Sequence, residues 1–158
     1  MSEWGYIRST HASSGWSSRG GQTRNPYVLD RSPLGSSSGS AVAVAANLCT
    51  VAIGAEVDGS VVRPASANGV VGLKPTVGLI SRQGIIGVAP TQDTAGIFAR
   101  TVEDVDRCLT VIAGTDPQDP ATKAADEERL TDYLAAMSAI SLWGLHGSVL
   151  VVILTTIG

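Results

Sequence analysis

Hydrophobic positions divide the chain into a polar first quarter and a following alternation of short apolar runs. Residues 1–39 are rich in Ser, Gly, Arg and Asn and keep neither a two-residue nor a 3.6-residue period, which predicts a long loop. Residues 40–48 are almost all small or aliphatic and follow Ser and Gly residues able to cap a helix, so we expect a buried helix there. Short β-prone runs bounded by Gly and Pro predict strands over 50–53 and 69–73.

Two further helices and a region of turns are also expected. Residues 61–67 predict one or two helical turns, with a proline tolerated near the start. Residues 76–90 alternate Gly with aliphatic runs and predict turns that join edge strands. Thr101, followed closely by acidic residues, opens a helix much as a capping box does, and Gly114 ends it. One face of this helix is apolar and consists of Val102, Val105, Leu109 and Ile112.

The C-terminal part of the chain is less regular. Residues 116–122 contain two prolines and predict a linker, 126–140 predict a weaker helix, and 148–153 predict a buried strand. This last apolar run is about half the ~20 residues that a membrane-spanning helix needs. Alternating helices and near-continuous apolar strands together predict an α/β fold whose sheet is covered by helices on both faces.

Composition supports a folded domain of small side chains. The 158 residues are 44% apolar and 16% charged, which excludes a disordered or fibrous chain. Aromatic residues make up only 4% while Gly occurs 18 times, so the core must be built from close packing of Ala, Val, Ile and Leu. The net charge of −3 leaves no basic excess for phosphates, and we expect no nucleic-acid partner.

Cysteine and histidine usage suggests neither a disulfide nor a metal centre. Cys49 and Cys108 lie in apolar surroundings and are interpreted as buried free thiols of a reducing compartment. The N-terminus shows no basic stretch followed by an apolar run, so no signal peptide is expected and the cytoplasm is the expected location. His11 and His146 lie in no motif, and we assign them no role.

Two loops rich in Ser and Gly carry the candidate chemistry. Residues 35–40 and 58–60 each precede a predicted helix, where free amides and the helix dipole favour negative charge. Such a place suits a nucleophile and an oxyanion, although Ser and Gly are also the usual capping and turn residues. Gly35–Gly39 also fits the pattern G-x-S-x-G, with Ser37 as nucleophile, but no strand precedes it. A phosphate-binding loop would need a lysine at its end, and none occurs before Lys74.

Taken together, the serine loops and their neighbours resemble the amidase signature family. The resemblance extends over about 2–122, and its motifs occur in a fixed order at 20–27, 32–40, 56–66, 69–78, 92–96 and 99–102. It implies a mixed, twisted sheet covered by helices on both faces. It also implies hydrolysis of a carboxylic amide without metal or cofactor, through a Ser–cis-Ser–Lys triad and an acyl-enzyme.

The resemblance implies a role for each residue of the two loops. Ser60 corresponds to the nucleophile and Ser36 to the bridging serine, whose preceding peptide bond is cis in the family and follows Gly35 here. Ser37 and Arg63 support the loops or face the substrate. The oxyanion hole would be formed by the backbone amides of Val57, Asp58, Gly59 and Ser60. The carboxylates of Glu56 and Asp58 are interpreted as acceptors for backbone amides of the loop.

The base of the triad is the point at which this chain departs from the family. A buried, neutral lysine would accept the proton relayed by Ser36. The family places that lysine further towards the N-terminus than this chain reaches, and Lys74 and Lys123 do not match it. We therefore expect an internal piece of an amidase whose fold is incomplete and which shows little turnover by itself.

The expected organisation follows the motifs. Residues 1–39 form a loop-rich N-terminal part of the amidase core, 40–122 the signature core segment, and 123–158 a truncated C-terminal continuation. Two alternatives stay open: a glutamine-hydrolysing subunit of a tRNA-dependent amidotransferase, and a non-catalytic remnant. The expected partner is a small-molecule amide, with no membrane and with nucleic acid only in the amidotransferase case. The oligomeric state is left open.

Overall fold

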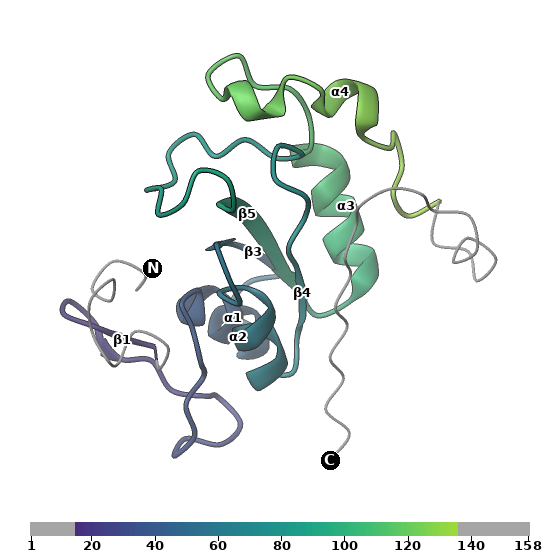
Figure 1. The fold of residues 1–158 in the computed structure, drawn as a ribbon. Helices are drawn as coiled ribbons and strands as arrows, with labels where there is room; N and C mark the ends of the chain where they lie inside the picture. Colours follow the sequence, from purple (N-terminus) through teal and green to yellow (C-terminus); the bar gives the residue numbers. More distant parts are fainter. Residues whose placement is uncertain (1–14, 136–158) are drawn as a thin grey trace.

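The computed structural model of the chain describes residues 15–135 and shows a small sheet between helices (Figure 1). The strands are β1 (Trp16–Ser17), β2 (Gly21–Gln22), β3 (Val51–Glu56), β4 (Val71–Leu73) and β5 (Thr94–Ala99). The helices are α1 (Ser38–Ala45), α2 (Val62–Ala67), α3 (Val102–Ile112) and α4 (Ala125–Glu128), with a 3-10 turn η3 at Pro120–Thr122. In this part of the chain, no helix is long and apolar enough to cross a membrane.

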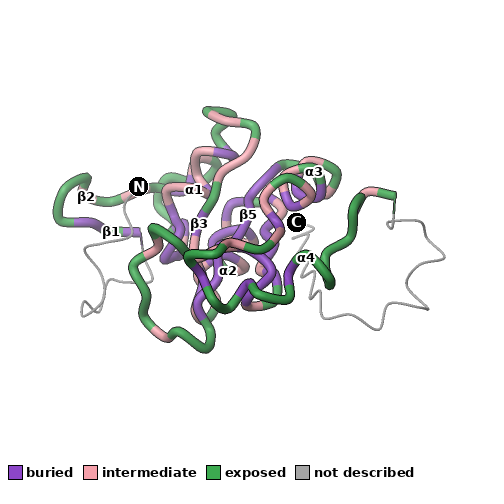
Figure 2. The backbone as a smooth tube through the Cα atoms, turned by 90° about the horizontal axis from the view of Figure 1, so that it is seen from above, coloured by how far each residue is buried: buried purple, intermediate pink, exposed green. Residues whose placement is uncertain are grey.

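The main sheet has the strand order β3-β5-β4, so the last of its strands in sequence lies in the middle. β5 pairs antiparallel with both neighbours, and all six of its residues are buried. Ile97 contributes to a core cluster that contains residues of α3, whereas Phe98 contributes to one that contains residues of α1 and α2. Helices therefore cover both faces of the sheet, and the predicted α/β class is confirmed (Figure 1). Figure 2 shows β5 as a continuous buried stretch.

Glycines on the sheet allow α1 and α2 to approach it closely. Gly54 of β3 pairs with Gly96 of β5, and Gly72 of β4 pairs with Phe98. A Cβ atom on Gly96 would lie 2.5 Å from Cγ2 of Val61, and one on Gly72 would lie 2.5 Å from a side-chain atom of α2. Since Cβ atoms do not approach this closely, only glycine permits the observed separation of helix and sheet.

The start of α3 is stabilised as the sequence predicts. Thr101 is extended, and its hydroxyl oxygen accepts a hydrogen bond from the Asp104 N–H at 3.1 Å. Glu103 and Asp104 place negative charge in the first turn, where the helix dipole favours it. Val105 and Leu109 are buried against the sheet, and the helix ends one residue before Ala113.

Of two predictions about local structure, one is confirmed in its main point and one is wrong. Residues 76–90 form turns without a strand, as expected, although β4 lies at the edge of the sheet and β5, the other strand that they join, lies in its centre. The helix predicted over 126–140 is limited in the described residues to α4, because Arg129 is already extended. Residues 136–140 of that helix and the strand predicted over 148–153 lie outside the described residues.

The two cysteines are free, as expected, but they are half-buried rather than buried. Cys49 follows α1 in the turn that leads to β3, and Cys108 lies on α3 next to the core cluster of that face. Partial burial raises the pKa of the Cys108 thiol, which makes it a poorer nucleophile at neutral pH.

Candidate active site

The Ser36 loop ends the long N-terminal segment and leads directly into α1. The peptide bond between Gly35 and Ser36 is cis, as the sequence resemblance implies. Ser36 is 8% exposed, and Ser37 and Ser38 are fully buried. Leu34 has a positive φ of 55°. The Ser36 side chain therefore lies within the protein, two residues before the start of the helix.

Ser37 joins this loop to the end of β3. Its hydroxyl donates to the Ala55 carbonyl at 3.1 Å and accepts from the Ala55 N–H at 3.1 Å. Its own N–H donates to the Ser60 carbonyl oxygen at 3.1 Å. The two serine loops predicted from sequence are therefore in direct hydrogen-bonded contact. Ser37 is interpreted as the support of the loops rather than as a nucleophile, because both hydrogen-bonding functions of its hydroxyl are used.

The Ser60 loop follows β3 and is closed by a carboxylate. Oε2 of Glu56 accepts hydrogen bonds from the N–H groups of Val61 at 2.6 Å and Val62 at 3.0 Å. Glu56 is only 5% exposed, so these charge-assisted bonds replace the water that the carboxylate loses. The loop from Glu56 to Ser60 is thereby folded into a tight arc before α2. The prediction that Glu56 accepts backbone amides is confirmed, whereas the same prediction for Asp58 is wrong, because its exposed carboxylate accepts no hydrogen bond from residues 15–135.

Asp58 lies within the Ser60 loop and Arg63 lies on α2, which follows it. The side chains of both residues are exposed. The Arg63 N–H donates to the Gly59 carbonyl at 3.0 Å, and a Cβ atom on Gly59 would lie 2.6 Å from Cδ of Arg63. Gly59 also has a positive φ of 76°, which disfavours any side chain there. Arg63 therefore packs over the loop and supports it.

The Ser60 loop also carries a cluster of backbone donors. Among residues 15–135, the N–H groups of Asp58, Gly59 and Ser60 have no protein acceptor. They are adjacent in sequence and lie next to the half-buried Ser60 side chain. Clustered free N–H groups of this kind bind anions and stabilise developing negative charge on oxygen. Such an arrangement can hold the oxyanion of a tetrahedral intermediate.

The lysines lie outside this pair of loops in sequence. Lys74 follows β4 directly and is half-buried, and Lys123 follows η3 and is exposed. His11 and His146 lie outside the described residues.

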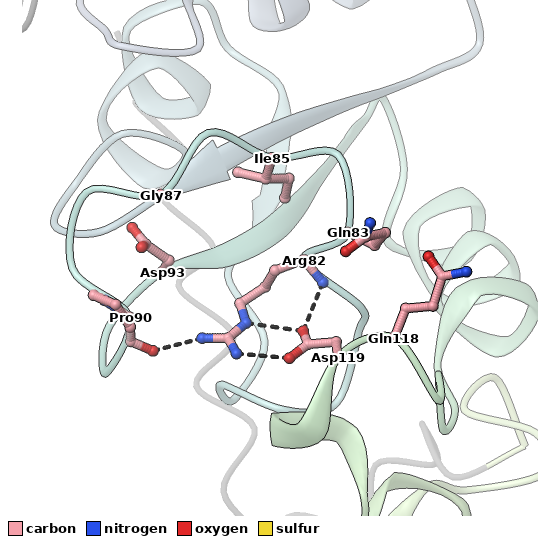
Figure 3. Close-up of a pocket in the computed structure, with 8 residues that line it drawn as sticks. All are labelled: Arg82, Gln83, Ile85, Gly87, Pro90, Asp93, Gln118 and Asp119. Carbon is pink, nitrogen blue, oxygen red and sulfur yellow. Dashed lines mark hydrogen bonds and ion pairs between the residues drawn. The ribbon is translucent and has the colours of Figure 1, made fainter.

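A second polar cluster, which the sequence does not suggest, joins the loop before β5 to the segment after α3 (Figure 3). The Arg82 guanidinium forms an ion pair with Asp119 at 2.7 Å and also donates to the Pro90 carbonyl at 2.5 Å. The Arg82 N–H donates to the same Asp119 carboxylate at 2.9 Å. These residues line a surface pocket together with Gln83, Ile85, Gly87, Asp93 and Gln118. Arg82 and Asp119 are 37 residues apart, and no local sequence pattern predicts that they form an ion pair.

We predict a pH-dependent contribution of Asp119 to stability. Hydrogen bonds from Arg82 hold the pKa of this carboxyl well below its usual value. A carboxylate with a lowered folded-state pKa stabilises the fold above its unfolded pKa of about 4, and the contribution is lost as the pH falls through the folded pKa. We therefore expect Asp119→Asn to lower the free energy of unfolding at pH 7, and the deficit to shrink below about pH 4. Urea unfolding at pH 7 and pH 3 measures both values.

The matched control for this prediction is Asp126→Asn. Asp126 also pairs with an arginine, Arg129, but both side chains of that pair are about half exposed. Exposed ion pairs contribute about 0–1 kcal/mol to the free energy of unfolding, so Asp126→Asn should change that free energy little at either pH. A deficit in Asp119→Asn that is the same at pH 7 and pH 3 would contradict the assignment.

Comparisons with known proteins agree on one family. A family model described as Amidase matches residues 1–139. A probable amidase of Arabidopsis thaliana is 53% identical over 127 residues, which is 80% of this chain and 25% of that protein. The native peptide amidase of Stenotrophomonas maltophilia superposes with a TM-score of 0.78 at 62% identity, covering 85% of this chain and 28% of that one.

Glutamyl-tRNA(Gln) amidotransferases are also similar. The matching subunit of the Thermotoga maritima enzyme superposes with a TM-score of 0.62 at 47% identity, covering 63% of this chain and 22% of that one. Its counterpart in Desulforapulum autotrophicum is 45% identical over 127 residues, which is 80% of this chain and 26% of that protein. The chain thus spans about a quarter of the length of the relatives that it matches.

Proposed function

Because this chain belongs to the amidase family, we propose that it contributes the nucleophile and the oxyanion hole of an enzyme that hydrolyses a carboxylic amide C–N bond. The observation that carries the proposal is the hydrogen bond from the Ser37 N–H to the Ser60 carbonyl, at 3.1 Å. It joins the loop of the bridging serine, Ser36, to the loop of the nucleophile. The unpaired N–H groups of Asp58 and Gly59 support it, since an acyl-transfer site needs donors beside its nucleophile.

In the proposed reaction, Ser60 Oγ attacks the carbonyl carbon of the amide. Its proton passes to Ser36 Oγ, which releases its own proton to a base, a lysine in the pattern that the family resemblance implies. The negative charge on the carbonyl oxygen is held by the backbone amides of the segment from Val57 to Ser60. The C–N bond then breaks, and the amine leaves with the relayed proton. Water hydrolyses the resulting ester and restores the Ser60 hydroxyl.

Similarity to the solved structures favours a simple amidase over part of an amidotransferase. Identity is 62% to the peptide amidase of S. maltophilia and 47% to the amidotransferase chain of T. maritima. We therefore propose a peptide amide as the first substrate to test, with release of ammonia as the measured product. Ammonia release from glutamine instead, with none from the peptide amide, would favour the amidotransferase alternative.

Labelling with a fluorophosphonate tests the proposed nucleophile in the full-length protein that contains this sequence. We expect covalent modification of Ser60, located by mass spectrometry of the digested protein, and no modification in Ser60→Ala. Ser66→Ala is the matched control, because Ser66 is equally half-buried and lies in α2, outside the two loops. A folded protein that is not labelled at Ser60 would overturn the proposal and favour the non-catalytic alternative.

A further inference from the structure

Asn68 connects the end of α2 to the segment that carries Ser36. This residue caps the C-terminus of α2 and is fully buried. Its Nδ2 atom donates to the Pro64 carbonyl at 2.7 Å, one turn back in the helix, and to the Pro33 carbonyl at 2.9 Å. Pro33 lies just ahead of the cis bond between Gly35 and Ser36. One amide group therefore holds a helix and a distant loop at once.

We propose that Asn68 is a positioning residue that sets Ser36 relative to Ser60. α2 begins two residues after Ser60, so its placement follows the nucleophile loop. The Pro33 carbonyl, in turn, fixes the entry of the chain into the Ser36 loop. A proton relay between two hydroxyls depends on their separation, and a shift of about 1 Å at such a site costs about 100-fold in rate. This inference rests on the proposed function, because it concerns the same two serines.

The hydrogen-bonding state of Asn68 indicates that its donors are the functional part of the side chain. Both N–H groups of Nδ2 have carbonyl acceptors, whereas the buried Oδ1 has no donor among the residues that the structure describes. A buried amide that leaves its acceptor unpaired loses stability. A residue that served only to fill space or end the helix would not need the second donor.

Asn68→Ser separates the two contacts. A serine hydroxyl in this position can donate to the Pro64 carbonyl four residues earlier, as serines at helix ends commonly do. Its side chain is one bond too short to reach the Pro33 carbonyl as well. The variant therefore keeps the helix end and loses the connection to the Ser36 loop.

Asn25→Ser is the matched control. Asn25 is also buried, at 5% exposed, and its Nδ2 donates to the Ala67 carbonyl at 2.6 Å, beside Asn68. Its Oδ1 accepts from the N–H groups of Tyr27 and Val28, so it anchors an earlier part of the same long loop. The control removes a comparable buried amide at the same helix end without touching the carbonyl that precedes Ser36.

The experiment measures the rate of fluorophosphonate labelling at Ser60 in the full-length protein, at saturating probe and well below the melting temperature of each variant. We expect Asn68→Ser to label about 10- to 100-fold more slowly than wild type, and Asn25→Ser at the wild-type rate. If Asn68→Ser does not fold, Asn68→Thr replaces it, since its hydroxyl can make the same contact to Pro64 and it places no charge in this buried site.

Two of the other outcomes overturn the role of Asn68 alone, and a third overturns the proposed function as well. Labelling of Asn68→Ser at the wild-type rate overturns the role of Asn68 and leaves the proposed function intact. Equal slowing of Asn68→Ser and Asn25→Ser also overturns it, because the effect would then be general loss of packing. A wild-type protein that is not labelled at Ser60 overturns the proposed function and the role of Asn68 with it.

Discussion

Ser60→Ala is expected to lower the rate of amide hydrolysis by about 10⁴- to 10⁶-fold, as losses of a nucleophile or its partners do in serine hydrolases. The variant removes the only atom at that position able to form the acyl-enzyme, while the neighbouring N–H groups keep their arrangement. Ammonia release from a peptide amide by the full-length protein, followed under single-turnover conditions, measures the loss. Because the remaining loop still binds substrate, we expect KM to change little.

Two further variants are compared with Ser60→Ala: one should also lose activity, and the other should keep it. Ser36→Ala should also lower kcat strongly, because the proton of Ser60 would lose its relay. Ser66→Ala should leave kcat and KM at wild-type values, since Ser66 lies on α2 away from both loops. Residual hydrolysis above one hundredth of the wild-type rate in Ser60→Ala would assign the nucleophile to another residue.

Gly54→Ala is expected to damage both stability and the reactivity of Ser60. The added Cβ atom would lie 2.5 Å from Oγ of Ser37, 2.7 Å from Cβ of Ser37 and 2.8 Å from Cε2 of Phe98. Phe98 is fixed in the core, so Ser37 must move and its hydrogen bonds to Ala55 must lengthen. Overpacking of this kind costs about 1–3 kcal/mol. Urea unfolding and the fluorophosphonate labelling rate measure the two effects.

The control for this prediction is another glycine with an ordinary backbone conformation. Gly20 is exposed, and a Cβ atom there would meet only Oγ of Ser17 at 3.3 Å, a contact that a shift of a few tenths of an ångström relieves. The free energy of unfolding of Gly20→Ala should therefore stay within about 0.5 kcal/mol of the wild-type value. A Gly54→Ala protein with wild-type stability would show that the loop of Ser37 yields easily. It would then contradict the close contact between this loop and β3.

Much of the fold can be predicted where a local pattern decides the structure. The first helix is expected over 40–48 and is observed at Ser38–Ala45, because a run of small and aliphatic residues after a stretch of Ser and Gly is a local signal. The start of α3 can be predicted because Thr101 and the acidic residues after it stabilise the helix within its first turn. β5 is missed, because Thr94–Ala99 is buried on both faces and shows no alternation. The turns of 76–90 are predicted as turns, but their path is not, because contacts distant in sequence, such as that of Arg82 with Asp119, determine it.

The candidate site shows the same division between local and distant information. Motifs alone lead to the proposal of Ser36 and Ser60 as site residues, and they correctly predict Glu56 as an acceptor for backbone amides. The contact between the two loops depends on Ser37 and on the absence of a side chain at Gly54, and no pattern within either loop reveals it. Asn68 is missed for the same reason, since its partner carbonyl is 35 residues away.

The position of β5 has a consequence for the order in which the protein folds during synthesis. Within residues 15–135, β3 and β4 do not pair with each other, and both pair with β5, which leaves the ribosome after both of them. The chain that has emerged up to Ala67 already contains both serines, but not the strand with which β3 pairs. Because pairing between distant segments is slow compared with helix formation, we expect α1 and α2 to form first. The two serine loops should acquire their mutual geometry late, in the same event that inserts β5.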